Sequence, residues 1–164
     1  MTALVAFVLG ALIGGRMATA MSSGPRYRWT GTAFGIEATL LLAATAIAGC
    51  YGNGFWAAAT GVYSVIVLSG LAMGVRNATV RKLGVPDLTT TVLTLTITGL
   101  AADSTLGGGS NPGWKRRTAA VAAMFTGAAL GAWLLLYSIA VPLALATVVT
   151  GLCAVAAYHA RTAE

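Results

Sequence analysis

The sequence predicts an all-α integral membrane protein with five transmembrane helices and one short re-entrant half-helix. Hydrophobic residues make up 57% of the 164 residues and charged residues only 9%, against about 25% charged residues in soluble domains. Crossing a bilayer takes about 20 apolar residues, and five runs are long enough: 2–20, 32–50, 55–75, 118–137 and 139–159. We expect one membrane domain over residues 1–164.

The first run also resembles the core of a signal peptide, because Ala18-Thr19-Ala20 has the composition of a cleavage site. No basic residue precedes the core, however, and Arg16 stands between the core and that site. We therefore expect the first run to be a retained span.

A sixth apolar run, residues 88–102, is too short to cross. Its 15 residues include six Thr, and at ~1.5 Å per residue it covers about 23 Å of the ~30 Å hydrocarbon core. If it crossed, the basic residues would divide between the two sides of the membrane. If it enters and leaves on one side, all ten Lys and Arg face the cytoplasm, as the positive-inside rule requires. We therefore predict a half-helix over residues 87–103, with the N-terminus outside and the C-terminus inside.

The half-helix has a clear start signal in Val85-Pro86-Asp87, where Asp87 is suited to be an N-cap. Thr90, Thr94 and Thr98 recur every four residues and share one helix face. Irregular backbone at membrane depth is stable only inside protein or beside a watery cavity, so we expect this segment to lie in such a setting.

Small residues at helix-packing spacing recur along the chain. Four GxxxG pairs are present: Gly10/Gly14, Gly31/Gly35, Gly70/Gly74 and Gly127/Gly131. Such pairs let helix backbones approach closely in membranes. We expect contacts within the bundle, and a homo-oligomer or membrane partner through such faces. The basic residues stand between apolar runs, so we expect the lipid bilayer and no nucleic acid as a partner.

Two of the spans look related. Residues 7–14 and 125–131 each begin with Phe and end in a GAxxG pattern. In the predicted topology the two spans run in opposite directions, which is the mark of an inverted repeat and is common in secondary transporters.

The stretch 70–84, GLAMGVRNATVRKLG, with Thr89–Thr91 and Thr94-Leu95-Thr96 after it, resembles the YoaK-like family of bacterial multi-pass membrane proteins of unknown function. The resemblance covers nearly the whole chain and implies two three-span repeats, each with a half-helix. Leu95 stands where the family usually has Gly. The family's first span and half-helix have no counterpart here, so we expect a short form, a misplaced start codon or a degenerate gene.

Candidate site residues cluster near the ends of the second and third spans. Arg76 and Asn77 close the third run and could contact an anion beside the N-terminus of the half-helix; the alternative is an interfacial Arg. Glu37 lies inside the second run and could carry a proton or pair with Arg76; the alternative is a Glu that reaches water. Thr90, Thr94 and Thr98 are either ligands or packing residues.

Other polar and aromatic residues carry weaker expectations. We expect Asp103 to be solvated at an aqueous boundary. The aromatic residues near span ends predict an interfacial belt: Trp29, Tyr51, Trp56 and Trp114. Cys50 and Cys153 are expected to be packing residues, because neither has metal-ligand spacing.

The sequence predicts no enzyme, since no Ser/His/Asp set, phosphate loop or paired carboxylates are present. No catalytic residue, metal or cofactor is expected. The leading hypothesis is a transporter-like protein of the bacterial inner membrane that moves a small anion or polar solute. The alternatives are a non-transporting scaffold or subunit of a larger complex, or a truncated relic.

Overall fold

A computed structural model describes residues 1–21, 25–84, 93–110 and 113–159. Within these ranges the regular structure is entirely helical. The long helices are α1 (Thr2–Ala20), α2 (Arg26–Tyr51), α3 (Ala59–Leu83), α5 (Trp114–Leu135) and α6 (Ala140–His159), and the short ones are η1 (Gly52–Ala57), α4 (Leu93–Ala102) and η3 (Thr105–Gly107). The five long helices are long and apolar enough to cross a membrane, so the predicted fold class is confirmed.

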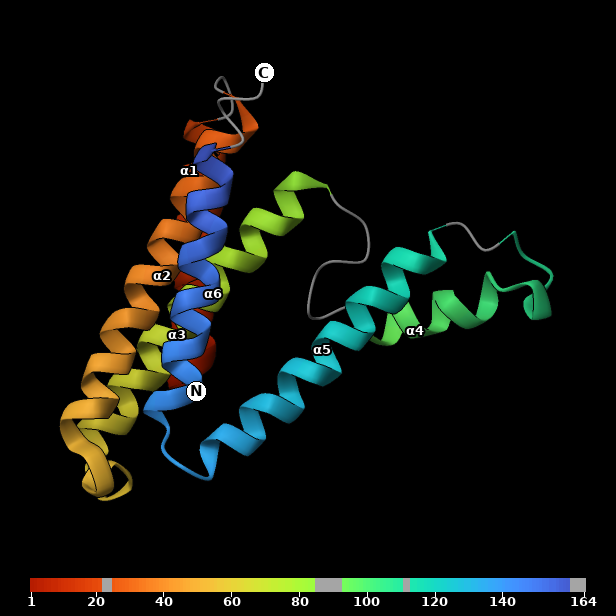
Figure 1. Cartoon of the computed structure of the whole chain (residues 1–164). Helices are drawn as coiled ribbons and strands as arrows, with labels where there is room; N and C mark the ends of the chain where they lie inside the picture. The colour runs from red at the N-terminus through yellow and green to blue at the C-terminus, as the bar shows by residue number, and fades with distance from the viewer. Residues whose placement is uncertain (22–24, 85–92, 111–112, 160–164) are drawn as a thin grey trace.

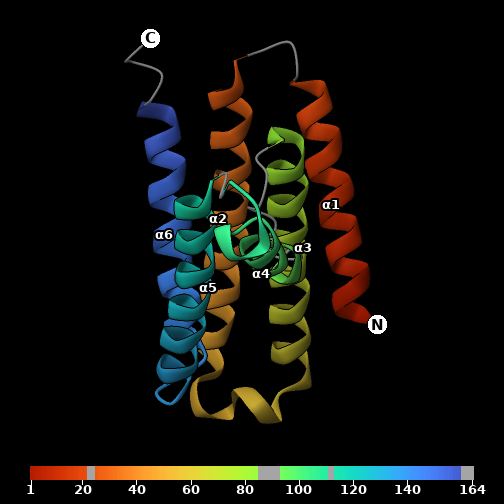
Figure 2. The ribbon, with the colours of Figure 1, turned by 90° about the vertical axis from the view of Figure 1, so that its right-hand side faces the viewer.

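Four helices form the bundle: α2 packs between α3 and α6, and α1 packs on α3 (Figure 1). In Figure 2, α1, α3 and α6 run upward, whereas α2 and α5 run downward. The antiparallel register of α2 and α6 is fixed by two hydroxyl contacts. Thr32 Oγ1 lies 3.5 Å from the Tyr158 hydroxyl, and Thr45 Oγ1 lies 3.3 Å from Thr147 Oγ1. The upper end of the bundle carries Arg16, Arg28 and Lys82, and is called the basic end below.

Glycine brings α1 and α3 into direct backbone contact. A Cβ added to Gly10 would overlap the backbone of Leu71, and one added to Gly74 would overlap the backbone of Phe7. A Cβ on Gly14 would lie 2.9 Å from the carbonyl oxygen of Val75. Two of the four GxxxG pairs therefore face each other across one parallel interface, as small-xxx-small packing requires.

The other two pairs behave differently. A Cβ on Gly31 would meet the ring of Tyr158 at 3.1 Å, whereas one on Gly35 would meet nothing within 4 Å. Gly127 and Gly131 of α5 also face open space. The expectation of packing through GxxxG is thus confirmed for the α1–α3 interface alone, and the inverted repeat stays a prediction.

A hairpin of α4 and α5 stands apart from the bundle (Figure 1). The helix α5 has no buried residue and meets α6 next to the short turn that joins them. The helix α4 packs on α5 and has 10 residues, so it spans about 15 Å and cannot cross the ~30 Å core. The short sixth helix is confirmed, and its re-entrant placement in a bilayer stays a prediction.

The helix bounds in the structure differ at several ends from the bounds of the predicted spans. The first span was predicted at 2–20, where α1 lies, but α2 begins at Arg26 rather than 32, and α3 starts at Ala59 rather than 55. The helix α3 continues past residue 75 to Leu83, so the helix is longer than the predicted third span. Charged residues end an apolar run without ending a helix. The helix stops at Gly84, whose φ of 65° is left-handed and suits a glycine C-cap.

Candidate functional site

Glu37 occupies the interior of the bundle. It lies on α2, the helix with neighbours on two sides, and the residue is only 1% exposed. The ion pair that the sequence allowed is present: Arg76 Nη1 donates to Glu37 Oε1 over 3.3 Å. The Arg76 side chain is 42% exposed, so the pair joins a buried acid to a base that reaches the surface.

The second carboxylate oxygen of Glu37 has no hydrogen-bond partner, although it is fully buried. Among the described side chains the same holds for Ser69 Oγ on α3. By contrast, the buried hydroxyl of Thr79 donates to Val75 O at 2.8 Å. The helix backbone thus accepts the hydrogen bond of the buried Thr79 hydroxyl, whereas Glu37 Oε2 and Ser69 Oγ have no hydrogen-bond partner. Unsatisfied buried polar atoms are uncommon in native proteins, and each calls for an explanation.

Ser69 and Arg76 are seven residues apart on α3, so they lie on the same helix face. Along the axis of α3, Ser69 lies about 10 Å from Arg76, toward the middle of the helix, at ~1.5 Å per residue. The Glu37–Arg76 pair and Ser69 are therefore two separate polar positions on one face of α3. Ser69 could not be predicted from the sequence, because one Ser in an apolar run carries no signal of burial.

Asn77 has a local role. Its Nδ2 donates to Met73 O at 2.8 Å, one turn back on α3. Arg76 and Asn77 do not end the helix, because α3 runs about two turns farther, to Leu83. Asn77 as a substrate contact stays a prediction.

The Thr-rich segment is described only in part. Thr90 and Asp87 lie outside the described residues, and so does the side chain of Thr94. Thr98 is exposed. Whether the three Thr residues share a face with the Glu37–Arg76 pair therefore stays a prediction.

The structure adds a contact to one expectation about a single residue and overturns another. The Asp103 side chain is 45% exposed, as expected at an aqueous boundary, and Arg117 Nη1 also donates to Asp103 Oδ2 over 2.6 Å. Trp29 does not belong to an exposed belt, because it is only 6% exposed. Trp56 and Trp114 are exposed at 71% and 49%, as interfacial residues should be.

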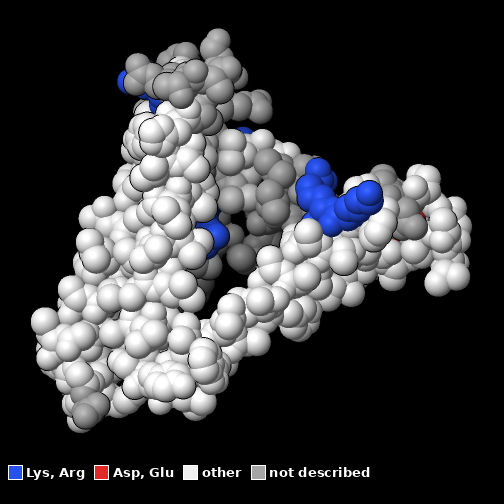
Figure 3. Space-filling view, viewed as in Figure 1, with Lys and Arg blue, Asp and Glu red and all other residues white. Residues whose placement is uncertain are grey.

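Basic side chains are unevenly placed on the surface. On the face shown in Figure 3, Lys and Arg lie at the start of α5 and over the upper part of the bundle, and the described atoms of the lower part are uncharged. Within the described ranges, no group of three His, Cys, Asp or Glu side chains comes together as metal ligands would.

A model of a protein family matches residues 1–157, and its description reads "Protein of unknown function (DUF1275)". The chain belongs to the DUF1275 family. No curated protein and no solved structure matches it. Since the DUF1275 description assigns no activity, the function of this DUF1275 chain must be argued from the buried Glu37 and its surroundings.

Proposed function

We propose that this DUF1275 chain is transporter-like and moves a small anion or polar solute across the membrane. The observation that carries the proposal is the fully buried Glu37, whose Oε1 pairs with Arg76 and whose Oε2 has no partner. Ionisable groups inside membrane spans are rare, and they commonly mark solute or proton pathways.

The chemistry of the pair supports anion binding. A guanidinium has five N–H donors, and Glu37 takes one of them through Oε1. The part of Arg76 that is exposed can offer two parallel donors to a carboxylate, phosphate or similar group. A solute anion bound there would compete with Glu37 for the positive charge of Arg76.

Competition at Arg76 gives a route to coupling. When an anion binds the guanidinium, its negative charge offsets the countercharge that Arg76 supplies to Glu37. A buried carboxylate without a countercharge is strongly unfavourable, so uptake of a proton by Glu37 would accompany solute binding. The unpartnered Ser69 hydroxyl lies farther along the same face and would serve a solute or a water as it passes.

The setting in the cell follows from the charge distribution. We place the chain in the bacterial inner membrane, with the N-terminus outside and the C-terminus in the cytoplasm, since this puts the basic end inside. The run 70–84 supports membership of the YoaK-like group. No catalytic role, cofactor or metal enters the proposal.

Transport is tested in proteoliposomes that contain the purified chain, with chloride, nitrate, formate and phosphate as probes. The readouts are uptake of the probe and the change of internal pH, because one proton moving with one monovalent anion carries no net current. We expect uptake of at least one probe, and we expect Arg76→Ala to abolish it. Glu37→Gln should retain binding but uncouple flux from the pH gradient. Arg81→Ala, a change of an exposed Arg on the same helix, is the matched control. Unchanged flux in both site variants, or no uptake of any probe, would count against the proposal.

A scaffold or subunit role is the second candidate, and one observation favours it. The helix α5 has no buried residue, and a Cβ on Gly127 or Gly131 would meet nothing within 4 Å, so this GxxxG face is open to another helix. In a cysteine-free background, Gly127→Cys should form disulfide-linked dimers in the membrane if a second copy packs there, and Ala44→Cys, at a fully buried position, is the control. Absence of cross-linking would remove the homo-oligomer.

A further inference from the structure

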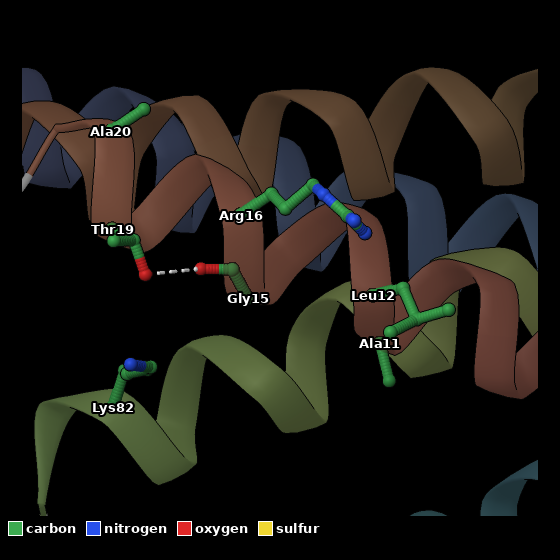
Figure 4. A pocket seen from close by; sticks show the side chains of 7 residues that line it. All are labelled: Ala11, Leu12, Gly15, Arg16, Thr19, Ala20 and Lys82. Carbon is green, nitrogen blue, oxygen red and sulfur yellow. Dashed lines mark hydrogen bonds between the residues drawn. The ribbon is translucent and has the colours of Figure 1, made fainter.

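The structure contains a groove that the proposed function does not use. It lies between α1 and α3 near the basic end and has a volume of about 620 Å³. Its lining is Ala11, Leu12, Gly15, Arg16, Thr19 and Ala20 from α1 together with Lys82 from α3 (Figure 4).

The groove exists because the close packing of α1 on α3 stops abruptly. Gly14 is the last glycine in contact, and a Cβ there would lie 3.0 Å from the Cα of Val75. A Cβ on the next residue, Gly15, would meet nothing within 4 Å. Figure 4 shows the two helices near each other at Ala11 and farther apart at Thr19 and Lys82. The space is therefore set by backbone geometry rather than by a mobile side chain.

The charges of the groove are of one sign. Arg16 and Lys82 are both exposed, and neither forms an ion pair with a carboxylate of the described residues. No acidic residue is among the lining residues. Two cations from two helices thus line one groove: in Figure 4 the Arg16 side chain extends along α1 toward Leu12, and Lys82 lies across from Thr19.

The rest of the lining is apolar. Ala11 and Leu12 line the part that continues toward the middle of α1, so the groove combines two cationic side chains with an apolar wall. A free phosphate would gain nothing from the apolar part, whereas a molecule with an anionic head and a hydrocarbon tail would match both parts. Basic pockets between transmembrane helices recognise anionic lipid head groups in this way.

We propose that the α1–α3 groove is a binding site for one anionic phospholipid, with the head group attracted by Arg16 and Lys82 and an acyl chain along Ala11 and Leu12. The bidentate guanidinium suits a phosphate, and the ammonium on its flexible stem adapts to the second oxygen. The site is independent of the transport proposal, because it involves neither Glu37 nor Arg76.

The test is a titration of the detergent-purified full chain with phosphatidylglycerol or phosphatidylcholine, read by native mass spectrometry. We expect the first phosphatidylglycerol to bind much more tightly than phosphatidylcholine. Each basic side chain near an anionic lipid contributes roughly fivefold in affinity, so Arg16→Gln with Lys82→Gln should weaken that binding about 25-fold. The matched control is Arg81→Gln with Lys115→Gln, which removes two exposed cations that do not line the groove.

A second variant separates a lipid from a free anion and covers the case in which the double variant does not fold. Gly15→Leu places a side chain in the groove from a position where a Cβ meets nothing within 4 Å, and it leaves both cations in place. Loss of phosphatidylglycerol binding by Gly15→Leu supports a lipid. Retained binding that soluble glycerol phosphate displaces would overturn the lipid in favour of a free anion. Equal losses in the groove variant and the matched control would overturn the site, because the attraction would then be general.

Discussion

Arg117 Nη1 lies 2.6 Å from Asp103 Oδ2, and this ion pair ties α5 to the end of α4. Gly99 makes the approach possible, because a Cβ there would lie 3.0 Å from the same Arg117 nitrogen. The Asp103 amide also donates to Gly99 O over 2.9 Å, which holds Asp103 at the helix end. The α4–α5 hairpin thus depends on a few polar contacts, since α5 buries no residue in the bundle.

The first prediction is that Asp103→Asn loosens α4 and leaves the bundle intact. The Asp103 side chain is 45% exposed, and pairs at such sites contribute about 0.2–1 kcal/mol. We expect faster hydrogen exchange in the α4 peptide and a nearly unchanged melting temperature, measured by mass spectrometry and circular dichroism. Lys115→Gln is the control, and a charge swap between Asp103 and Arg117 should restore protection. Unaltered exchange in Asp103→Asn would mean that the pair does not hold α4.

The second prediction concerns the glycine interface of α1 and α3. Gly74→Leu should abolish folding or lower the melting temperature strongly, because even a Cβ at Gly74 would overlap the backbone of Phe7. Overpacking of a well-packed core typically costs about 1–3 kcal/mol of stability. The cost at Gly74 should be at the upper end, because the backbone of Phe7 cannot move aside as easily as a side chain. Gly127→Leu should be tolerated, since its Cβ meets nothing within 4 Å. Thermal unfolding in detergent checks both, and equal losses would contradict the assigned interface.

The glycines show how far sequence reasoning reaches for the fold. Apolar run length located all five long helices, because a helix in lipid must be apolar along its whole length. The GxxxG pattern did not distinguish Gly74 from Gly127, although the structure uses the first and leaves the second open. The GxxxG spacing within one helix indicates that one helix face has no side chains that would keep another helix away. Which helix packs on that face depends on how the helices cross, and the sequence of one span does not predict the crossing.

The third prediction is that Arg76→Ala destabilises the protein more than the double change of Glu37→Gln with Arg76→Ala. Removal of Arg76 alone leaves a carboxylate that is 1% exposed without a countercharge, whereas a neutral amide at residue 37 needs none. Leaving one partner of such a pair unsatisfied typically costs about 1–3 kcal/mol. Denaturation in detergent with a double-mutant cycle gives the coupling. A double variant that is less stable than Arg76→Ala would contradict this account.

The part of the candidate site that follows from opposite charges was predictable from the sequence. An acid and a base near one membrane side were expected to meet, and Glu37 and Arg76 do. Ser69 was not predictable, because it stands out only through a buried hydroxyl without a hydrogen-bond partner. Whether a hydroxyl finds a partner depends on how the helices pack. Asp103 and Arg117 are 14 residues apart across a turn whose geometry the sequence does not give.

The fourth prediction is that α4 does not cross the membrane, so that Ser104 is reached from the side of the basic end. A helix of 10 residues covers only half of the hydrocarbon core, about 15 of ~30 Å, and α3 and α5 on either side of it run in opposite directions (Figure 2). We replace Cys50 and Cys153 by Ala and introduce Ser104→Cys. A membrane-impermeant maleimide should label it in inverted vesicles and not in intact cells.

Two marker positions calibrate this labelling experiment. Lys82→Cys, at the basic end, should behave like Ser104→Cys, and Gly54→Cys, in η1 at the opposite end, should label in intact cells. The result would contradict the prediction if Ser104→Cys followed Gly54→Cys, because the segment before Ser104 would then cross fully. In that case Lys115, Arg116 and Arg117 would face outward, and the charge argument that places the C-terminus inside would lose its basis.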